Sequence, residues 1–234
     1  MKTLKVSQLV LCGAVVLSLS PLASASYTLY GATPYLSFAD SPFNPPSTAY
    51  FYLEDFEDGL LNTPGVTASA GYLTSLGYPH IYIDSVDGDD GSIDGHGNDG
   101  ESWFASSGAT GITFTFNSLV LGSLPTQVGI VWTDGLDPVT VKFYDGSNIL
   151  MGSASASGLA DGNFGGGTAE DRFFGLDYSG GIGSIFISSG AGAGIEVDHL
   201  QYGGGRLAIP SPGALLLASI GAGVIGWLRR RSVL

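Results

Sequence analysis

The chain has 234 residues, of which 44% are hydrophobic and 12% charged, which leaves room for one mid-sized domain with short appendages. Five of its eight basic residues lie at the two ends, so residues 26–209 carry only three basic residues against all 21 acidic ones, a net charge of −18. This charge repels phosphate backbones and excludes nucleic acid as an expected partner, whereas divalent cations suit it.

The N-terminus has the features of a secretory signal peptide. Two lysines precede an apolar run over residues 9–19, and Ala23 and Ala25 provide the small residues that signal peptidase recognises. We therefore expect residues 1–25 to be removed during export. The single cysteine, Cys12, lies within this segment, so the mature chain must fold without disulfides.

The central part of the chain has the pattern of an all-β domain. Residues 26–49 contain four prolines and lack sustained periodicity, which predicts a leader or a peripheral strand. From Tyr50, short segments rich in aromatic and β-branched residues are separated by glycines, and no segment sustains a helical period. Apolar residues alternate with period two at residues 112–116, 128–132 and 139–143. We expect residues 50–202 to form an antiparallel β-sandwich, jelly-roll-like in topology.

Glycine-containing turn signals mark the ends of several predicted strands. Asp134-Gly135 and Asp145-Gly146 are dipeptides typical of β-hairpins. Three consecutive glycines at residues 203–205 predict a flexible spacer over residues 203–209.

An Asp/Gly-rich segment over residues 84–104 is the strongest candidate for cation binding. Read from Asp90, the sequence DGSIDGHGNDGE has the ligand spacing of a twelve-residue EF-hand loop. The expected calcium ligands are Asp90, Ser92, Asp94, His96 (through its backbone carbonyl), Asn98 and Glu101. If the register differs, the alternative ligands are Asp84, Asp87, Asp89 and Asp99. Strand-like flanks and Gly97 at the usually apolar position predict a calcium loop on a β-scaffold, and the alternative is a solvated turn without metal.

Other polar residues give no catalytic signature. The acidic cluster Glu54, Asp55, Glu57 and Asp58 is interpreted as a charged strand end, with participation in a metal site or a glycosidase carboxylate pair as alternatives. Asp198 and His199 are neighbours on a predicted strand and should point to opposite faces, so they should not form a dyad. The histidines lack metal-ligand spacing, no nucleophile elbow is present, and we expect no enzymatic activity.

Aromatic residues could provide a sugar-stacking platform, although in a sandwich most of them are expected in the core. The candidates are Tyr50, Tyr52, Tyr72, Tyr78, Tyr82, Trp103, Trp132 and Tyr144.

The C-terminal residues 210–234 predict a membrane segment. Pro210, Ser211 and Pro212 precede sixteen uncharged residues, and Arg229, Arg230 and Arg231 follow at once. Sixteen helical residues cover about 24 Å, so a bilayer core of about 30 Å also needs some preceding residues. By the positive-inside rule the arginines stay in the cytoplasm and the domain is exported. An ordinary single-pass anchor is the alternative.

This tail resembles the PEP-CTERM sorting signal of Gram-negative bacteria, with Ser211 in place of the usual glutamate. The resemblance implies recognition and cleavage by exosortase, a membrane transpeptidase-like enzyme, and an association with extracellular polysaccharide and biofilm. Residues 50–203 also resemble a recurrent, uncharacterised β-rich domain that precedes such tails. The segments that carry this likeness are DSVDGDDGSIDGHG, GITFTFN, LGSLPTQVGIVWTD, TAEDRFFG and IEVDHLQYG.

We therefore expect an exported protein of the cell envelope, cell surface or extracellular matrix that binds exopolysaccharide without catalysis, with calcium as a cofactor. Signal peptidase and exosortase are its expected partners during export, and the C-terminal helix anchors it in the membrane before processing. The alternatives are a self-associating structural matrix protein and a polysaccharide-degrading enzyme.

Overall fold

The computed structural model describes residues 27–206, 220, 221 and 225. The predicted signal peptide and peptidase site lie outside the described residues, as do Pro210 to Pro212 and the three arginines of the predicted sorting tail. Within the described parts of the chain, no helix is long and apolar enough to cross a membrane.

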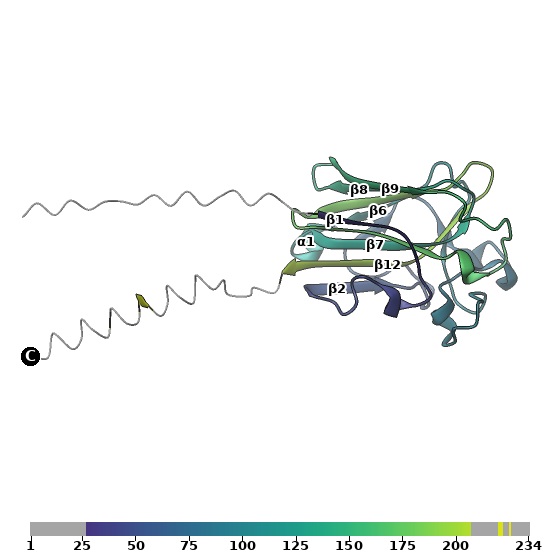
Figure 1. Cartoon of the computed structure of the whole chain (residues 1–234), viewed down its shortest axis with the longest axis horizontal. Coiled ribbons are helices and arrows are strands. Elements are labelled where there is room, and N and C mark those ends of the chain that lie inside the picture. Colours follow the sequence, from purple (N-terminus) through teal and green to yellow (C-terminus); the bar gives the residue numbers. More distant parts are fainter. Residues whose placement is uncertain (1–26, 207–219, 222–224, 226–234) are drawn as a thin grey trace, which may run out of the picture.

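Twelve strands between residues 27 and 206 form two antiparallel sheets stacked as a sandwich (Figure 1). The larger sheet has the order β1-β10-β7-β12-β5-β4, and β2 also pairs with β12. Its strands are β1 (Tyr27–Pro34), β2 (Thr48–Glu54), β4 (Tyr72–Leu73), β5 (Trp103–Ala105), β7 (Pro125–Gly135), β10 (Arg172–Tyr178) and β12 (Ile195–Arg206). The smaller sheet, in the order β3-β6-β11-β8-β9, contains β3 (Val66–Ala68), β6 (Ile112–Phe116), β8 (Val139–Asp145), β9 (Leu150–Ala156) and β11 (Ile182–Ser188). The predicted all-β class and antiparallel sandwich are confirmed.

Short helical turns connect the strands. One α-helical turn, α1 (Ser118–Leu121), precedes β7. The 3-10 turns are η1 (Phe38–Asp40), η2 (Thr74–Leu76), η3 (His80–Tyr82), η4 (Asp87–Asp90) and η5 (Thr168–Glu170).

The main core lies between the two sheets, and its residues follow the predicted alternation. Ile112, Phe114 and Phe116 on β6 are buried, as are Val139, Val141 and Phe143 on β8. They pack against inward residues of the larger sheet, among them Ile130, Trp132 and Val197. Period-two apolar spacing therefore identified the inner faces correctly, because successive strand residues point to opposite sides.

A second, smaller core covers the outer face of the larger sheet. Val131 on β7 and Phe173 on β10 point outward, yet both are fully buried. Tyr35, Phe43 and Val86 cover them from two irregular segments. The Asp/Gly-rich segment that follows Val86 is therefore held against the sheet.

Two turn predictions had different outcomes. Asp145-Gly146 does connect a hairpin, β8 to β9, in which the Asn148 amide donates to the Asp145 carbonyl at 3.0 Å. Asp134-Gly135, in contrast, ends β7 in the larger sheet, and the next strand, β8, belongs to the smaller sheet. The dipeptide therefore belongs to a crossover between layers, because local turn chemistry does not specify which strands pair.

The glycines from Gly203 lie in a strand rather than in the predicted spacer. Gly203 pairs with Phe51 on β2 and with Gln127 on β7. A Cβ atom at Gly203 would meet the Thr48 hydroxyl at 2.5 Å, and one at Gly204 would meet the Tyr50 hydroxyl at 2.3 Å. Close packing of β2 explains these glycines, and the domain extends through Arg206.

The start of β1 and the end of β12 lie at the same end of the sandwich (Figure 1). β1 is an edge strand of the larger sheet, so the sandwich begins before the predicted boundary at residue 50. It starts with Tyr27 opposite Tyr178, and β12 ends with Arg206 opposite Thr48. The first residues of β12 and the last of β7 lie at the opposite end, where Ile195 pairs with Gly135. The candidate site lies at that opposite end.

Candidate functional site

The central strand β12 anchors the Asp/Gly-rich segment through side chains on its outer face. Glu196 Oε1 accepts a hydrogen bond from the Asp84 amide at 3.3 Å, and Asp198 Oδ2 accepts one from the Val86 amide at 2.9 Å. Glu196 and Asp198 are almost completely buried. The acidic residues in IEVDHL therefore serve as acceptors for a segment that lies 112 positions away.

A β-bulge at His199 puts Asp198 and His199 on the same side, contrary to the prediction. Asp198 pairs with Val131 and Gln201 with Gly129, so β12 has one more residue than β7 between these pairs. His199 adopts φ +43°, a conformation that histidine tolerates better than most residues. The extra residue breaks the strict alternation on which the prediction relied.

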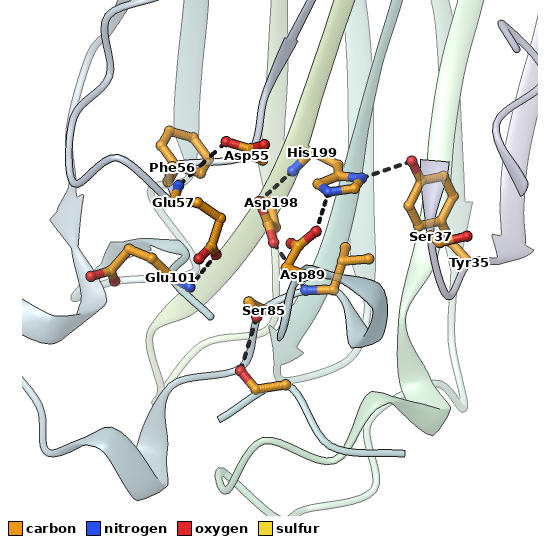
Figure 2. Close-up of polar contacts among 12 residues, drawn as sticks. Tyr35, Ser37, Asp55, Phe56, Glu57, Ser85, Asp89, Glu101, Asp198 and His199 are labelled. Atoms are coloured by element: carbon orange, nitrogen blue, oxygen red, sulfur yellow. Dashed lines mark hydrogen bonds and ion pairs between the residues drawn. The ribbon is translucent and has the colours of Figure 1, made fainter. Parts of the chain in front are cut away.

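His199 connects two segments through both of its ring nitrogens (Figure 2). Its Nε2 lies 2.8 Å from Asp89 Oδ1, and its Nδ1 lies 2.8 Å from the Tyr35 hydroxyl. Gln201 Nε2 donates to the same hydroxyl at 2.8 Å. The Tyr35 hydroxyl accepts from Gln201 and has no acceptor among the described residues other than His199 Nδ1, so it donates to Nδ1, and the Nε2–H donates to Asp89.

Asp89, Asp198 and His199 form the one group of three acidic or histidine residues in the described chain whose potential metal-ligand atoms all lie within 4.8 Å of one another. Nε2 donates its proton to Asp89 in this network and so has no lone pair free for a cation. Burial, together with the charge of Asp89, raises the pKa of Asp198 well above its ordinary range. The hydrogen bond between Asp89 and His199, called the Asp89–His199 clasp, therefore holds the loop against the larger sheet.

The six predicted calcium ligands engage mostly local partners. Asp90, Asp94 and Glu101 do not form a group of the kind just described. Asn98 Nδ2 donates to the Ile83 carbonyl at 3.2 Å. The carboxylates accept hydrogen bonds from backbone amides. Asp90 Oδ1 accepts from the Ser92 amide at 2.7 Å, and Asp94 Oδ1 accepts from the His96 amide at 3.2 Å. Glu101 Oε1 accepts from the Ser75 amide at 3.1 Å. Calcium binding by the Asp90–Glu101 loop stays a prediction.

The second acidic cluster contributes to loop structure. Glu54 Oε2 accepts from the amides of Asn62 and Thr63, both at 2.9 Å. Glu57 accepts from the amide of Glu101, which ties this cluster to the Asp/Gly-rich segment (Figure 2). Burial raises the pKa of Glu57 to about 7.

An open pocket of about 360 Å³ lies where β7 and β12 meet the loops of this end. Asp134 and Glu196 are register partners on these two strands, so their carboxyl groups stand side by side in the pocket. Burial raises the pKa of Asp134 to about 8 and that of Glu196 to about 7, and the mutual repulsion of nearby carboxylates adds to the shift of Asp134. The pocket therefore carries two carboxyl groups that hold protons near neutral pH.

Aromatic rings form the wall of this pocket. Tyr78, Tyr82 and Phe164 are each between 41% and 46% exposed, and Phe104 lies edge-on to Tyr78 at a ring distance of 4.8 Å. Of the eight aromatic residues proposed from sequence, only Tyr78 and Tyr82 line the pocket, and Trp132 is a fully buried core residue.

Sequence reasoning missed Asp134, Glu196, Phe104 and Phe164 as pocket residues. One signal was present in the sequence for Glu196: the acidic residues Glu196 and Asp198 alternate with the apolar residues Ile195 and Val197 on a predicted strand. The structure buries both acids. Acidic residues on a buried strand need partners, which marks them as structurally or chemically special.

The chain matched no family model, no curated protein and no solved structure in three separate comparisons. The site is therefore interpreted from its own geometry.

Proposed function

We propose that the domain is a non-catalytic module that binds a polysaccharide in the pocket at the loop end of the sandwich. One observation carries the proposal: three half-exposed aromatic rings, Tyr78, Tyr82 and Phe164, surround two nearly buried carboxyl groups. Ring faces pack on the apolar faces of sugars, and carboxyl groups bind hydroxyls. Jelly-roll-like sandwiches, the topology expected here, include lectin domains.

The charge of the domain favours a neutral, hydroxyl-rich polysaccharide. Residues 26–209 carry a net charge of −18, which repels an anionic polymer. The protonated forms of Asp134 and Glu196 can also donate hydrogen bonds to sugar hydroxyls.

The placement of the pocket suits the expected export and sorting of the chain. Tyr27 and Arg206 lie at the opposite end of the sandwich (Figure 1). A domain attached to the membrane through its C-terminal segment, or processed there by exosortase, would present the pocket outward to the envelope or matrix.

Binding can be tested by calorimetric titration of the full-length chain with neutral exopolysaccharide fragments, after a glycan array has selected them. Tyr78→Ala and Tyr82→Ala should each weaken binding about tenfold, since a lost ring contact contributes on the order of 1 kcal/mol. Tyr27→Ala is the matched control, because Tyr27 is 59% exposed and belongs to the opposite end. Absence of binding to any neutral glycan, with self-association in light scattering, would favour the structural alternative.

Hydrolysis of the bound glycan is a second candidate function, favoured by the side-by-side carboxyl groups of Asp134 and Glu196. Glycosidases need one protonated and one ionised carboxyl group on either side of the bond. Here the Ser102 hydroxyl donates to Glu196 Oε1 at 2.7 Å, and the Asp84 amide contacts the same oxygen. We expect binding without cleavage, and release of reducing ends that Glu196→Gln abolishes would instead identify an enzyme.

A further inference from the structure

Two aspartates in the described chain are buried without any hydrogen-bond partner. Asp84 is 1% exposed and Asp171 is completely buried, and neither oxygen of either carboxyl group has a partner. A buried carboxyl group without partners is strongly unfavourable, and native proteins rarely keep one. Two of them require a common explanation.

The two aspartates belong to segments that the fold brings together. The Ser85 amide donates to the Gly97 carbonyl at 3.2 Å, and the Gly97 amide donates to the Gly166 carbonyl at 3.0 Å. The Thr168 amide donates to the Gly95 carbonyl at 3.4 Å, two residues from that contact. Among neighbouring charges, Asp84 acts most strongly on Asp171 and raises its pKa, in addition to the larger effect of burial.

A third residue with an unpartnered oxygen lies in the same turn as Asp171. Thr168 is 1% exposed, and its hydroxyl has no hydrogen-bond partner among the described residues. The Asp171 amide donates to the Thr168 carbonyl at 3.2 Å, so η5 keeps the two residues one turn apart. Hard oxygen atoms without hydrogen-bond partners thus come from Asp84, Thr168 and Asp171.

No basic side chain forms an ion pair with these carboxyl groups within the described chain. Arg172 is the neighbouring cation, but its Nη1 donates to the backbone carbonyls of Ala169 at 3.0 Å and Asp171 at 2.7 Å. Protonation would not satisfy the carboxyl groups either, because each O–H would need an acceptor and none is in place. A bound cation satisfies all of these oxygens at once.

Calcium fits this donor set better than the other common metal ions. Zinc prefers nitrogen and sulfur ligands, whereas the three side chains offer oxygen alone. Magnesium keeps several waters and demands a near-ideal octahedron, which a buried turn does not readily provide. Calcium accepts carboxylate, hydroxyl and backbone carbonyl oxygens in flexible geometry.

We propose that Asp84 and Asp171, with the Thr168 hydroxyl, hold a calcium ion that joins the 84–97 segment to the 166–171 turn. This site uses other residues than the predicted Asp90–Glu101 calcium loop and the Asp89–His199 clasp. It does not depend on the proposed sugar binding, and its test contains no glycan.

The test uses the purified full-length chain, depleted with EGTA and then supplied with millimolar calcium chloride. The melting temperature should rise by at least about 5 °C, because a ligand that binds only the folded state stabilises it. Mass spectrometry of the metal content should find calcium retained after gel filtration.

Isosteric variants locate the ion. Asp84→Asn and Asp171→Asn should abolish the calcium-dependent rise. In EGTA both should melt at or above the wild type, since an amide cannot ionise and so never places a charge in the buried site. The matched control is the double variant Asp90→Asn/Asp94→Asn, which removes two exposed carboxylates of the predicted Asp90–Glu101 calcium loop. It should keep the full calcium-dependent rise in melting temperature.

Two results would overturn the proposal: a wild type that retains no calcium and shows no shift, or a shift that the loop double variant abolishes. If the buried-site variants do not fold, the double variant still separates the two predicted sites: loss of the calcium effect assigns the ion to the Asp90–Glu101 loop, and retention excludes that loop.

Discussion

At the residue scale, His199 shows how one strained residue organises a loop. Its positive φ places the imidazole between Tyr35 and Asp89, which come from two different irregular segments. Gln201 and Ser41 extend the network on the other side of Tyr35. In the buried chain, Gln201 donates to Tyr35, Tyr35 to His199 and His199 to Asp89, so loss of one member leaves others unsatisfied.

Tyr35→Phe tests this network. The change removes a buried hydroxyl and leaves His199 Nδ1 and one Gln201 donor without partners, so we expect a loss of about 1–3 kcal/mol in the free energy of unfolding. Urea denaturation measures it. Tyr27→Phe, at a 59% exposed position, should change stability by less than about 0.5 kcal/mol. Equal midpoints for the two variants would contradict a structural role for the hydroxyl.

At the element scale, the Asp/Gly-rich segment is a packed element with its own internal anchors. Asp87 is buried, and its Oδ1 accepts from the amides of Asp94 and Gly95, both at 3.0 Å. Gly97 then passes directly over Ser85, where only a hydrogen atom fits. The glycines of this segment therefore permit close backbone packing as well as turning.

Gly97→Ala should disturb this segment. A Cβ atom at Gly97 would lie 2.0 Å from the Ser85 carbonyl oxygen, which forces the backbones apart, and overpacking of this kind costs about 1–3 kcal/mol. Denaturation and limited proteolysis between residues 84 and 104 measure the effect. Gly167→Ala is the matched control across the same contact, because the nearest atom to its Cβ lies at 4.0 Å. Protease resistance equal to that of the control would refute the packing argument.

At the scale of the whole molecule, carboxyl groups accumulate at one end of the sandwich. The charges of Glu196, Glu170 and Asp161 contribute to the raised pKa values of Asp84 and Asp134 there, and burial is the largest cause of both shifts. The folded protein without bound cations therefore holds protons that the unfolded chain releases.

This accumulation predicts an inverted pH dependence of stability in EGTA. The folded-state pKa values are about 8 for Asp134 and about 7 for Glu196 and Glu170, against ordinary values near 4 in the unfolded chain. The stabilisation is fully present below about pH 4 and is lost as the pH rises to about 8, because the folded state binds more protons throughout that window. Urea midpoints at pH 5 and pH 8.5 should show the protein less stable at pH 8.5, by an amount on the order of a few kcal/mol.

Asp134→Asn is the control for this pH dependence, since an amide at that position cannot titrate and should reduce the difference between the two midpoints. A wild type that becomes more stable as the pH rises in EGTA would show that these carboxyl groups are ionised in the folded state.

The sequence by itself determined the fold class, the inner faces of the strands and the segment that deserved chemical interest. Ile112, Phe114 and Phe116 identify a buried face because adjacent residues of a strand alternate sides, a relation that needs no knowledge of partners. The density of acidic residues over residues 84–104 likewise indicated a candidate cation-binding segment. It did not indicate which oxygen atoms lack hydrogen-bond partners in the fold.

Only the tertiary structure decided which of these groups meet. The bulge at His199 depends on the register between β12 and β7, and the proximity of Asp84 to Asp171 depends on segments 87 positions apart packing together. The pocket combines residues from strands and loops spread over residues 78–196. Local sequence patterns reach only as far as the next few residues. Strand pairing and burial are properties of the whole fold, and they decide which polar groups find hydrogen-bond partners and which do not.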